Sequence, residues 1–415
     1  MPEAALHSTR HRWRQAQAAS DQVWTLVRPQ ALYRRPVPER HRLIFYLGHL
    51  EAFDWNLLAP LFELPAFHAE WDRLFAFGID PVDGQLPGDL PRDWPGVGEV
   101  MTYNREVRDR LDDAIEAGKV APVAAELEQR LQVALEHRWM HVETLSYLLH
   151  NLDYKDKHQG PGARPGAKPG AGTAAARGVG IAAGTATLGQ PRDRDFGWDN
   201  EFDEWQVTVP EFESDRFKVS NGAYLEFVEA GAAAPHFWVR RSNQWYYRGM
   251  FGEIELPLDQ PVYVTHAEAT AYAGWRGKSL PSEAQWHRMA YGAPEGSERR
   301  YPWGDAPPTP HRGNFNLVEW DPVAGGSYPA GASAWGVQDL LGNGWEWTRT
   351  PFEPFPGFVP FAFYPGYSAN FFDGKHYVIK GASARTAECF LRRSFRNWFQ
   401  PNYPHVYAGF RCVSR

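Results

Sequence analysis

The stretch "HRWMHVETLSYLLH", residues 137–150, decides how this chain is organised. His137 and His141 are four positions apart, so a helix places both imidazoles on one face, one turn apart. A metal ion can take two ligands from one helix at this spacing. Two helical histidines are more often ordinary surface or core residues, so a metal site requires a third ligand from elsewhere in the chain.

His49 supplies that third candidate, in the apolar helical stretch "FYLGHLEAFDWN". Three histidines from two packed helices leave metal positions open, as in a catalytic rather than a closed structural site. Zinc, iron and nickel are all compatible with imidazole ligands. Glu143 lies off the histidine face by roughly 200°, which favours an acceptor that orients an imidazole, or an exposed residue, over a ligand.

The chain divides into three parts that differ in composition and in the period of their apolar residues. Residues 1–157 carry helix-period apolar patterns that predict four helices, at about 9–27, 40–62, 104–118 and 121–152, packed as an antiparallel bundle. Residues 158–192 are dominated by Gly, Ala and Pro and are predicted to be a flexible linker. Residues 193–415 combine short strands, long loops and two helices, near 265–278 and 281–292. The prediction is a two-domain α+β protein whose second domain has little regular structure.

Composition excludes several classes of function. The net charge is −7 with no Lys/Arg cluster, so nucleic-acid binding is not expected. No stretch is apolar enough to predict a membrane span or a secretory signal, and the two cysteines fit a reducing compartment. We therefore expect a cytoplasmic protein that acts without a membrane. Aromatic residues make up 15% of the chain, which is typical of ring-lined pockets between irregular segments.

The C-terminal run "RRSFRNWFQPNYPH" offers ligand-binding side chains. Arg392, Arg393 and Arg396 could bind a carboxylate. Asn397 adds an amide, and Trp398 offers a ring for a trimethylammonium group. The alternative is equally compatible with the sequence: the arginines pair with local acids and the Trp packs in the core.

Two other aromatic stretches are ambiguous in the same way. Tyr364 and Tyr367 lie in a Gly/Pro-rich loop, where a phenol could act as a proton donor. Loop tyrosines are more often packing residues. In "LLGNGWEWT", residues 340–348, a tight turn leads into a strand, and a core role is favoured over catalysis. The acid- and Gly-rich turns at 197–204 are compatible with a structural calcium.

These motifs resemble a known pair of domains. "LGNGWEWT", "AYAGWRGKSLPSEAQW", "YPWGD", "GKHYVIKGAS" and "FRNW…YAGFRC" resemble the formylglycine-generating-enzyme-like (C-type-lectin-like) fold. "YLGH" and "HRWMHVET" resemble the DinB-like four-helix domain. Together they are similar to the ergothioneine-type sulfoxide synthases, and the resemblance covers almost the whole chain apart from the linker.

The resemblance implies a specific chemistry. In that family three histidines, matching His49, His137 and His141, hold a non-haem Fe(II), and the enzyme uses O2 to join sulfur to the imidazole of hercynine, which is trimethylhistidine. The second domain covers the metal. Asn397 and Trp398 match the residues that contact hercynine, and a pocket tyrosine that donates a proton aligns loosely with Tyr364 or Tyr367. Arg396, next to this pair in the chain, is a further candidate substrate-binding residue.

The sequence departs from the family where the thiol substrate binds. Phe399 replaces an Asp, Tyr403 replaces an Arg that grips the dipeptide thiol, and Met140 replaces a Gln. An apolar wall disfavours a charged thiol, whereas a sugar stacks on aromatic rings. These departures favour the related selenoneine synthase branch, in which hercynine receives selenium from a selenosugar.

Three other functions stay open at this point. The first is an ergothioneine-type sulfoxide synthase that uses a cysteine-type thiol. The second is a zinc-dependent DinB-like thiol transferase. The third is a non-catalytic binding module with structural histidines. A copper oxidase of the formylglycine-generating type is disfavoured, because Cys389 and Cys412 are not the closely spaced pair that it requires. The sequence does not predict an oligomeric state.

Overall fold

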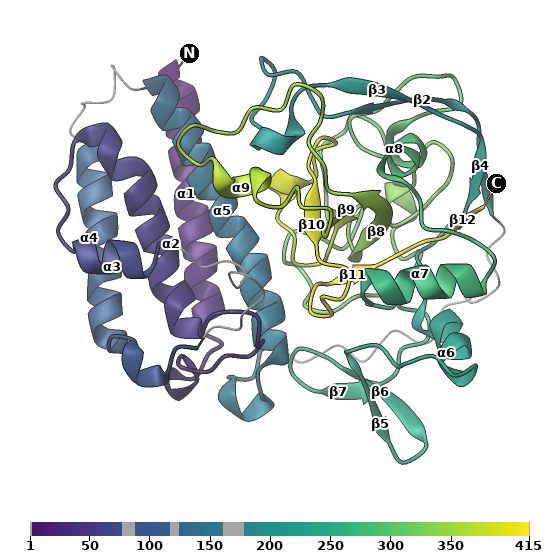
Figure 1. The fold of residues 1–415 in the computed structure, drawn as a ribbon, viewed down its shortest axis with the longest axis horizontal. Helices are drawn as coiled ribbons and strands as arrows, with labels where there is room; N and C mark the ends of the chain where they lie inside the picture. The colour runs from purple at the N-terminus through teal and green to yellow at the C-terminus, as the bar shows by residue number, and fades with distance from the viewer. Residues whose placement is uncertain (1, 77–87, 117–123, 161–177, 415) are drawn as a thin grey trace. The chain divides into compact units, whose positions relative to one another are not determined.

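The computed structural model describes residues 2–76, 88–116, 124–160 and 178–414. The chain forms two compact units, Met1–Pro161 and Gly162–Arg415. The first is helical and the second mixes helices with short strands (Figure 1). The predicted fold class, a two-domain α+β protein with an N-terminal helical domain, is confirmed. No helix in the described part of the chain is both long and apolar enough to cross a membrane.

Long amphipathic helices build the first unit. They are α1 (Pro2–Trp24), α2 (Leu43–Leu58), α4 (Val97–Glu116) and α5 (Ala124–Asn151). Helix α5 packs on α1 and α2, and α2 also packs on α4. Helix α2 is buried along nearly its whole length, because most of its residues are apolar and its buried acids, Glu51 and Asp54, are paired with Arg138. The predicted apolar stripe of α1 is buried at Trp13, Ala16 and Val23.

Two local features of this unit differ from prediction. Helix α4 begins at Val97 rather than near residue 104. Gly98 does not prevent this early start, because the first turn of a helix tolerates a glycine. A short helix, α3 (Ala69–Leu74), was not predicted and follows α2 after a turn. Residues 77–87 lie outside the described residues.

A buried cluster of charges joins the helices. Arg138 of α5 donates to Glu51 at 2.8 Å and to Asp54 at 2.5 Å, both on α2. Trp13 of α1 donates to Asp54 at 3.0 Å, and Arg108 of α4 donates to Glu51 at 3.0 Å. Arg138, Glu51 and Asp54 are at most 2% exposed. Burial raises the pKa of Asp54 to about 6, against the opposing charge of Arg138. The cluster therefore fixes how α1, α2, α4 and α5 meet.

Short strands form the framework of the second unit. One sheet has the order β10-β9-β8-β11, and its strands are β8 (Gly344–Pro351), β9 (Tyr377–Ala382), β10 (Asn397–Phe399) and β11 (Ala408–Gly409). A second has the order β1-β4-β12, from β1 (Val179–Ile181), β4 (Phe212–Ser214) and β12 (Val413–Ser414). The remaining pairings join β2 (Gly184–Leu188) with β3 (Trp205–Val209), and β5 (Trp238–Arg241) with β6 (Gln244–Arg248) and β7 (Glu253–Glu255).

The helices of this unit are α6 (Asn221–Glu229), α7 (His266–Trp275), α8 (Glu283–Tyr291) and the single turn α9 (Gly366–Ala369). The two predicted helices are confirmed as α7 and α8. Each begins with a capping box, in which Thr265 or Ser282 accepts a backbone N–H three residues later. Helix α8 packs on β2, β3, β8 and β9 and contributes to the hydrophobic core.

The turn before β8 confirms the core role predicted for "LLGNGWEWT". Gly342, Asn343 and Gly344 have φ values of 97°, 63° and 128°, which glycine adopts without strain and asparagine at small cost. Trp345 and Trp347 are then at most 1% exposed. Between them Glu346 accepts from Arg411 at 2.6 and 2.8 Å. This stretch is structural.

The linker prediction is wrong for residues 178–192. Strand β1 pairs antiparallel with β4, and β2 pairs with β3. The alternation in "VGIAAGTATL" puts Ile181, Ala186 and Leu188 inside, so Gly and Ala here lie in paired strands rather than in free coil. The most Gly- and Pro-rich part, residues 161–177, lies outside the described residues.

Replacing Arg138 tests the charge cluster. Arg138→Met should lower the free energy of unfolding by about 3–5 kcal/mol, because Glu51 and Asp54 would remain buried without their counter-charge. Arg105→Met, at an exposed arginine of α4, is the control and should change it by less than about 1 kcal/mol. Urea unfolding followed by circular dichroism measures both. Equal, small effects of the two substitutions would contradict this account.

Candidate metal centre

The structure brings the three predicted histidines together in the helical unit. His49 comes from α2, and His137 and His141 come from one face of α5. One ring nitrogen of each lies within 4.8 Å of those of the other two. His49 and His137 are 3% and 5% exposed, and His141 is partly buried. No other group of three or more His, Cys, Asp or Glu side chains in the described residues has this spacing.

The spacing within the cluster fits a shared metal ion. The Nε2 atoms of His137 and His141 are 3.2 Å apart. Two nitrogens bound to one ion at about 2.1 Å, with an angle of about 90–110° between them, lie about 3.0–3.4 Å apart. The observed separation falls within this range, and it is also the length of a hydrogen bond between the two rings.

His49 is held in a defined tautomer. Its Nδ1 lies 2.6 Å from the backbone carbonyl oxygen of Phe75, which can only accept, so Nδ1 carries the proton. Nε2 of His49 is buried and has no hydrogen-bond partner in the described structure. A buried lone pair without a donor is costly unless something else binds it. A metal ion at Nε2 would satisfy it.

Aromatic rings enclose the cluster and keep it neutral. Phe53 stacks on His137 with ring centres 3.5 Å apart, and Phe45 stacks on His49 at 4.9 Å. Burial lowers the pKa of His49 to about 4 and that of His137 and His141 well below its usual range. Neutral imidazole is the form that binds a metal, so no proton must be displaced near pH 7.

Two other residues of α5 were singled out from the sequence. Glu143 is partly buried, and its carboxylate is not part of the three-histidine group. This agrees with the expectation that Glu143 is not a ligand. Met140 is also partly buried, one position before His141, and its predicted role in substrate binding remains a prediction.

In the second unit, strand β10 presents the predicted substrate residues. The Trp398 ring stacks on Phe352 at 4.0 Å with an interplanar angle of 9°. Tyr367 approaches it edge-on at 5.5 Å. The Asn397 side-chain oxygen accepts the Trp398 backbone N–H at 2.9 Å. Both residues are partly exposed, so neither is sealed in the core.

The two candidate tyrosines differ in their surroundings. Tyr367 is buried and stacks on Trp198 at 3.9 Å, which is the geometry of a packing residue. Tyr364 is only partly buried, and burial raises its pKa to about 12. A phenol with this pKa is protonated at neutral pH and can donate a proton. Tyr364 is the more exposed of the two, and its role as a proton donor remains a prediction.

The arginines of the C-terminal run pair with acids of their own unit. Arg392 binds Glu201 at 2.8 Å, and Arg393 binds Glu298 at 3.1 Å. Arg396 is 2% exposed, and its three guanidinium nitrogens bind the Glu283 carboxylate and a backbone carbonyl at 3.0–3.1 Å. The predicted substrate-binding role of Arg396 is thus not supported, because Glu283 already fills the place of a carboxylate ligand.

Phe399 and Tyr403, the positions where a charged pair was replaced, form an aromatic surface. Their rings are parallel within 7° and 5.5 Å apart. Both are partly exposed. Two partly exposed rings stacked on each other give these positions an apolar surface.

The contacts of Asp199 were missed by the sequence reasoning, which considered residues 197–204 only as turns compatible with a structural calcium. The Asp199 carboxylate is fully buried and accepts from the Ser368 hydroxyl, which also accepts from Asn200 at 2.9 Å. This connection ties residues 198–201 to α9, next to Tyr364 and Tyr367. Burial raises the pKa of Asp199 to about 6. An Asp and an Asn directly after the Trp of this turn were the available signal.

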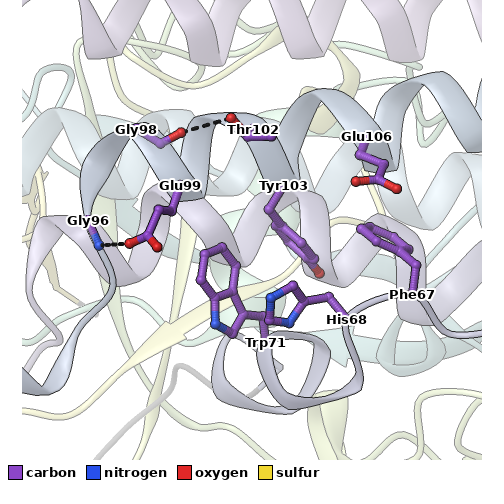
Figure 2. A pocket seen from close by; sticks show the side chains of 9 residues that line it. All are labelled: Phe67, His68, Trp71, Gly96, Gly98, Glu99, Thr102, Tyr103 and Glu106. Carbon is purple, nitrogen blue, oxygen red and sulfur yellow. Dashed lines mark hydrogen bonds between the residues drawn. The ribbon is translucent and has the colours of Figure 1, made fainter.

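A separate pocket of about 570 Å³ lies between α3 and the start of α4 (Figure 2). The rings of His68 and Trp71 lie together there with centres 4.2 Å apart, and Tyr103 meets Trp71 edge-on at 5.6 Å. Its carboxylates are already engaged: Glu106 with Arg110 at 2.6 Å, and Glu99 with the Gly96 backbone at 2.9 Å. None of the three clustered histidines lines it, and we assign it no role.

Comparisons with known proteins match both units. The family model described as Sulfatase-modifying factor enzyme 1-like domain matches residues 166–415, and the DinB superfamily model matches residues 12–145. Hercynine oxygenase of Mycobacterium tuberculosis is 38% identical over 53% of this chain and 56% of its own length. Ergothioneine biosynthesis protein 1 of Neurospora crassa is 27% identical over 97% of this chain and 57% of its own length. The chain thus spans about half the length of the curated relatives it matches.

Removing one histidine tests the metal centre. Cobalt(II) added to metal-free protein should bind once per chain, and His137→Ala should weaken that binding at least tenfold, because it removes one of three ligands. His11→Ala, at an exposed histidine of α1, is the control and should bind as the wild type does. Absorption titration measures both. Unchanged cobalt affinity in a folded His137→Ala protein would contradict the assignment.

The raised pKa of Asp199 predicts that the stability difference between wild type and Asp199→Asn depends on pH. The pKa of Asp199 falls from about 6 in the folded protein to its ordinary 3.8 on unfolding. Between these values the folded state binds more protons, so this group's contribution to stability is lost as pH rises through about 6. Relative to wild type, Asp199→Asn should therefore gain up to about 3 kcal/mol between pH 4 and pH 7.

Urea unfolding at several pH values measures this gain, and Asp193→Asn, at an exposed carboxylate of the same unit, is its control. A stability difference between Asp199→Asn and wild type that does not change with pH would show that the Asp199 carboxyl has an ordinary pKa.

Proposed function

The chain belongs to the Sulfatase-modifying factor enzyme 1-like domain family, and on that premise we propose that it is a non-haem Fe(II)- and O2-dependent oxidoreductase acting on hercynine. It joins the hercynine imidazole to sulfur or selenium. The observation that carries the proposal is the cluster of His49, His137 and His141, neutral and converging within 4.8 Å. The names of the relatives, hercynine oxygenase and ergothioneine biosynthesis protein 1, supply the substrate.

Iron is the metal that fits this proposal best. Imidazole binds zinc, nickel and iron, so the three histidines alone do not determine which metal is bound. An oxygenase needs a redox-active metal, and zinc has no redox chemistry. When bound by the three histidines, Fe(II) would have open positions at which O2 and the donor atom can be activated.

The chain's own residues bind and orient the substrate. Trp398 offers its ring to the trimethylammonium group of hercynine, an attraction worth about 0.5–2 kcal/mol. Asn397 beside it offers an amide for hydrogen bonding. Tyr364 holds a proton near neutral pH and is the donor, whereas Tyr367 supports Trp398 by packing.

Phe399 and Tyr403 favour an uncharged donor. Their parallel rings support a selenosugar, and hence a selenoneine synthase. The second candidate is an ergothioneine-type sulfoxide synthase with a cysteine-type thiol, which the names of the relatives favour. The two differ only in the donor.

Product analysis tests the function and separates the two donors. Iron-reconstituted protein, hercynine and O2 are incubated with either a selenosugar or γ-glutamylcysteine, and the products are measured by mass spectrometry. We expect a hercynine adduct, with the selenosugar preferred, and no adduct from His137→Ala. An adduct formed only with γ-glutamylcysteine would establish the sulfur enzyme. No adduct with either donor, despite bound iron, would overturn the proposal.

A charge placed on the aromatic surface tests the donor site. Phe399→Asp should weaken the use of an uncharged sugar donor by about 1–3 kcal/mol, or about 5- to 150-fold in kcat/KM, because a carboxylate replaces a stacking ring. Val359→Asp, at an exposed site of the same unit, controls for the added charge. Steady-state kinetics with each donor measures both. Equal effects of the two substitutions would exclude Phe399 from the donor site.

A further inference from the structure

We propose that Phe75 and Gly48 are positioning residues of the metal centre. The backbone carbonyl of Phe75 holds His49 in the tautomer that leaves Nε2 available to a metal. Gly48 is the residue whose missing side chain lets Phe75 come close enough to do so. This inference rests on the proposed role of the three histidines as metal ligands.

The tautomer of His49 follows from its partner. A carbonyl oxygen has no proton to give, so the 2.6 Å contact with Phe75 requires a proton on Nδ1. The Nδ1 atoms of His137 and His141 are buried and have no hydrogen-bond partner in the described structure. Among the three histidines, His49 is thus the one whose Nδ1 is held by a hydrogen bond in the described structure. Such contacts to ligand histidines typically change metal affinity 10- to 100-fold.

Gly48 makes room for the ring of Phe75. A Cβ built on Gly48 would lie 2.6 Å from two carbon atoms of that ring, well inside the 3.0 Å that real Cβ contacts keep. The ring has little freedom to move away, because Phe75 is 0% exposed and Trp94 stacks on it at 6.0 Å. Any side chain at position 48 must therefore displace Phe75 from α2.

Helix α3, which ends directly before Phe75, is held to its neighbours by hydrogen bonds, and it supports the Phe75 carbonyl. The Phe75 N–H donates to the Trp71 carbonyl at 2.9 Å and closes α3. Asp72, within α3, accepts from the Tyr103 hydroxyl of α4 at 2.8 Å. The Asp72 carbonyl accepts from Asn56 of α2 at 2.9 Å. A short helix that looks like a connection thus serves as a rigid support for one ligand.

Substitution of Gly48 tests the support. In metal-free Gly48→Ala protein, displacement of Phe75 should lengthen or break the His49 contact and lower cobalt(II) affinity about 10- to 100-fold. Gly98→Ala is the matched control, because a Cβ there meets nothing within 4 Å. Thermal melting of both proteins separates loss of fold from loss of affinity.

A second substitution tests whether Gly48→Ala acts through the ring of Phe75. Phe75→Leu removes the bulk that a new methyl group at position 48 would meet, and it keeps the backbone carbonyl. We therefore expect the double variant Gly48→Ala/Phe75→Leu to bind cobalt(II) more tightly than Gly48→Ala alone. No recovery in the double variant would contradict the claim that Gly48 acts through the Phe75 ring.

The tautomer of His49 distinguishes this positioning role from a purely structural one, because a structural role of Gly48 would leave the tautomer unchanged. Long-range proton–nitrogen NMR spectra of the metal-free wild type should show His49 protonated on Nδ1, and those of Gly48→Ala should show the Nε2-protonated form. A wild-type His49 protonated on Nε2 would overturn the inference even if Gly48→Ala does not fold. Unchanged cobalt affinity in folded Gly48→Ala would also overturn it. A wild type that binds no metal would instead overturn the proposed function.

Discussion

The buried pairing of Arg138 with Glu51 and Asp54 is the interaction on which the helical unit depends. Arg138 directly follows His137 on α5, and Glu51 lies two positions after His49 on α2. A helix cannot rotate about its axis without moving both neighbours, so the charge cluster also sets the faces on which the histidines lie. Charges this deeply buried add little net stability, but they specify one arrangement of the helices. The histidine cluster is a consequence of that arrangement.

Buried acid–arginine pairs have the same role in the second unit. Glu346 with Arg411 anchors β8, and Glu283 with Arg396 holds the start of β10. These arginines are occupied by the protein's own carboxylates, which leaves the exposed rings and the Asn397 amide to meet a ligand. The proposed recognition of hercynine in this unit therefore relies on Asn397 and on aromatic rings, Trp398 among them.

Much of this organisation could be read from the sequence, and the reasons for the failures are physical. The i, i+4 spacing of His137 and His141 and the apolar setting of His49 predicted the cluster, because helix geometry is local. The sequence does not show where a backbone carbonyl points, so the contact between the Phe75 carbonyl and His49 could not be predicted. Composition misled at residues 178–192, where pairing with distant strands orders a Gly- and Ala-rich segment. The partner of Arg396 lies 113 positions away, beyond any local pattern.

The central claim is that three histidines from two helices hold one iron ion. An anaerobic crystal structure of the Fe(II)-reconstituted protein, with anomalous scattering recorded at the iron edge, tests it most directly. The account predicts one iron peak, bonded to Nε2 of His49 and to ring nitrogens of His137 and His141. A peak elsewhere, or one that leaves His49 unbound, would contradict it.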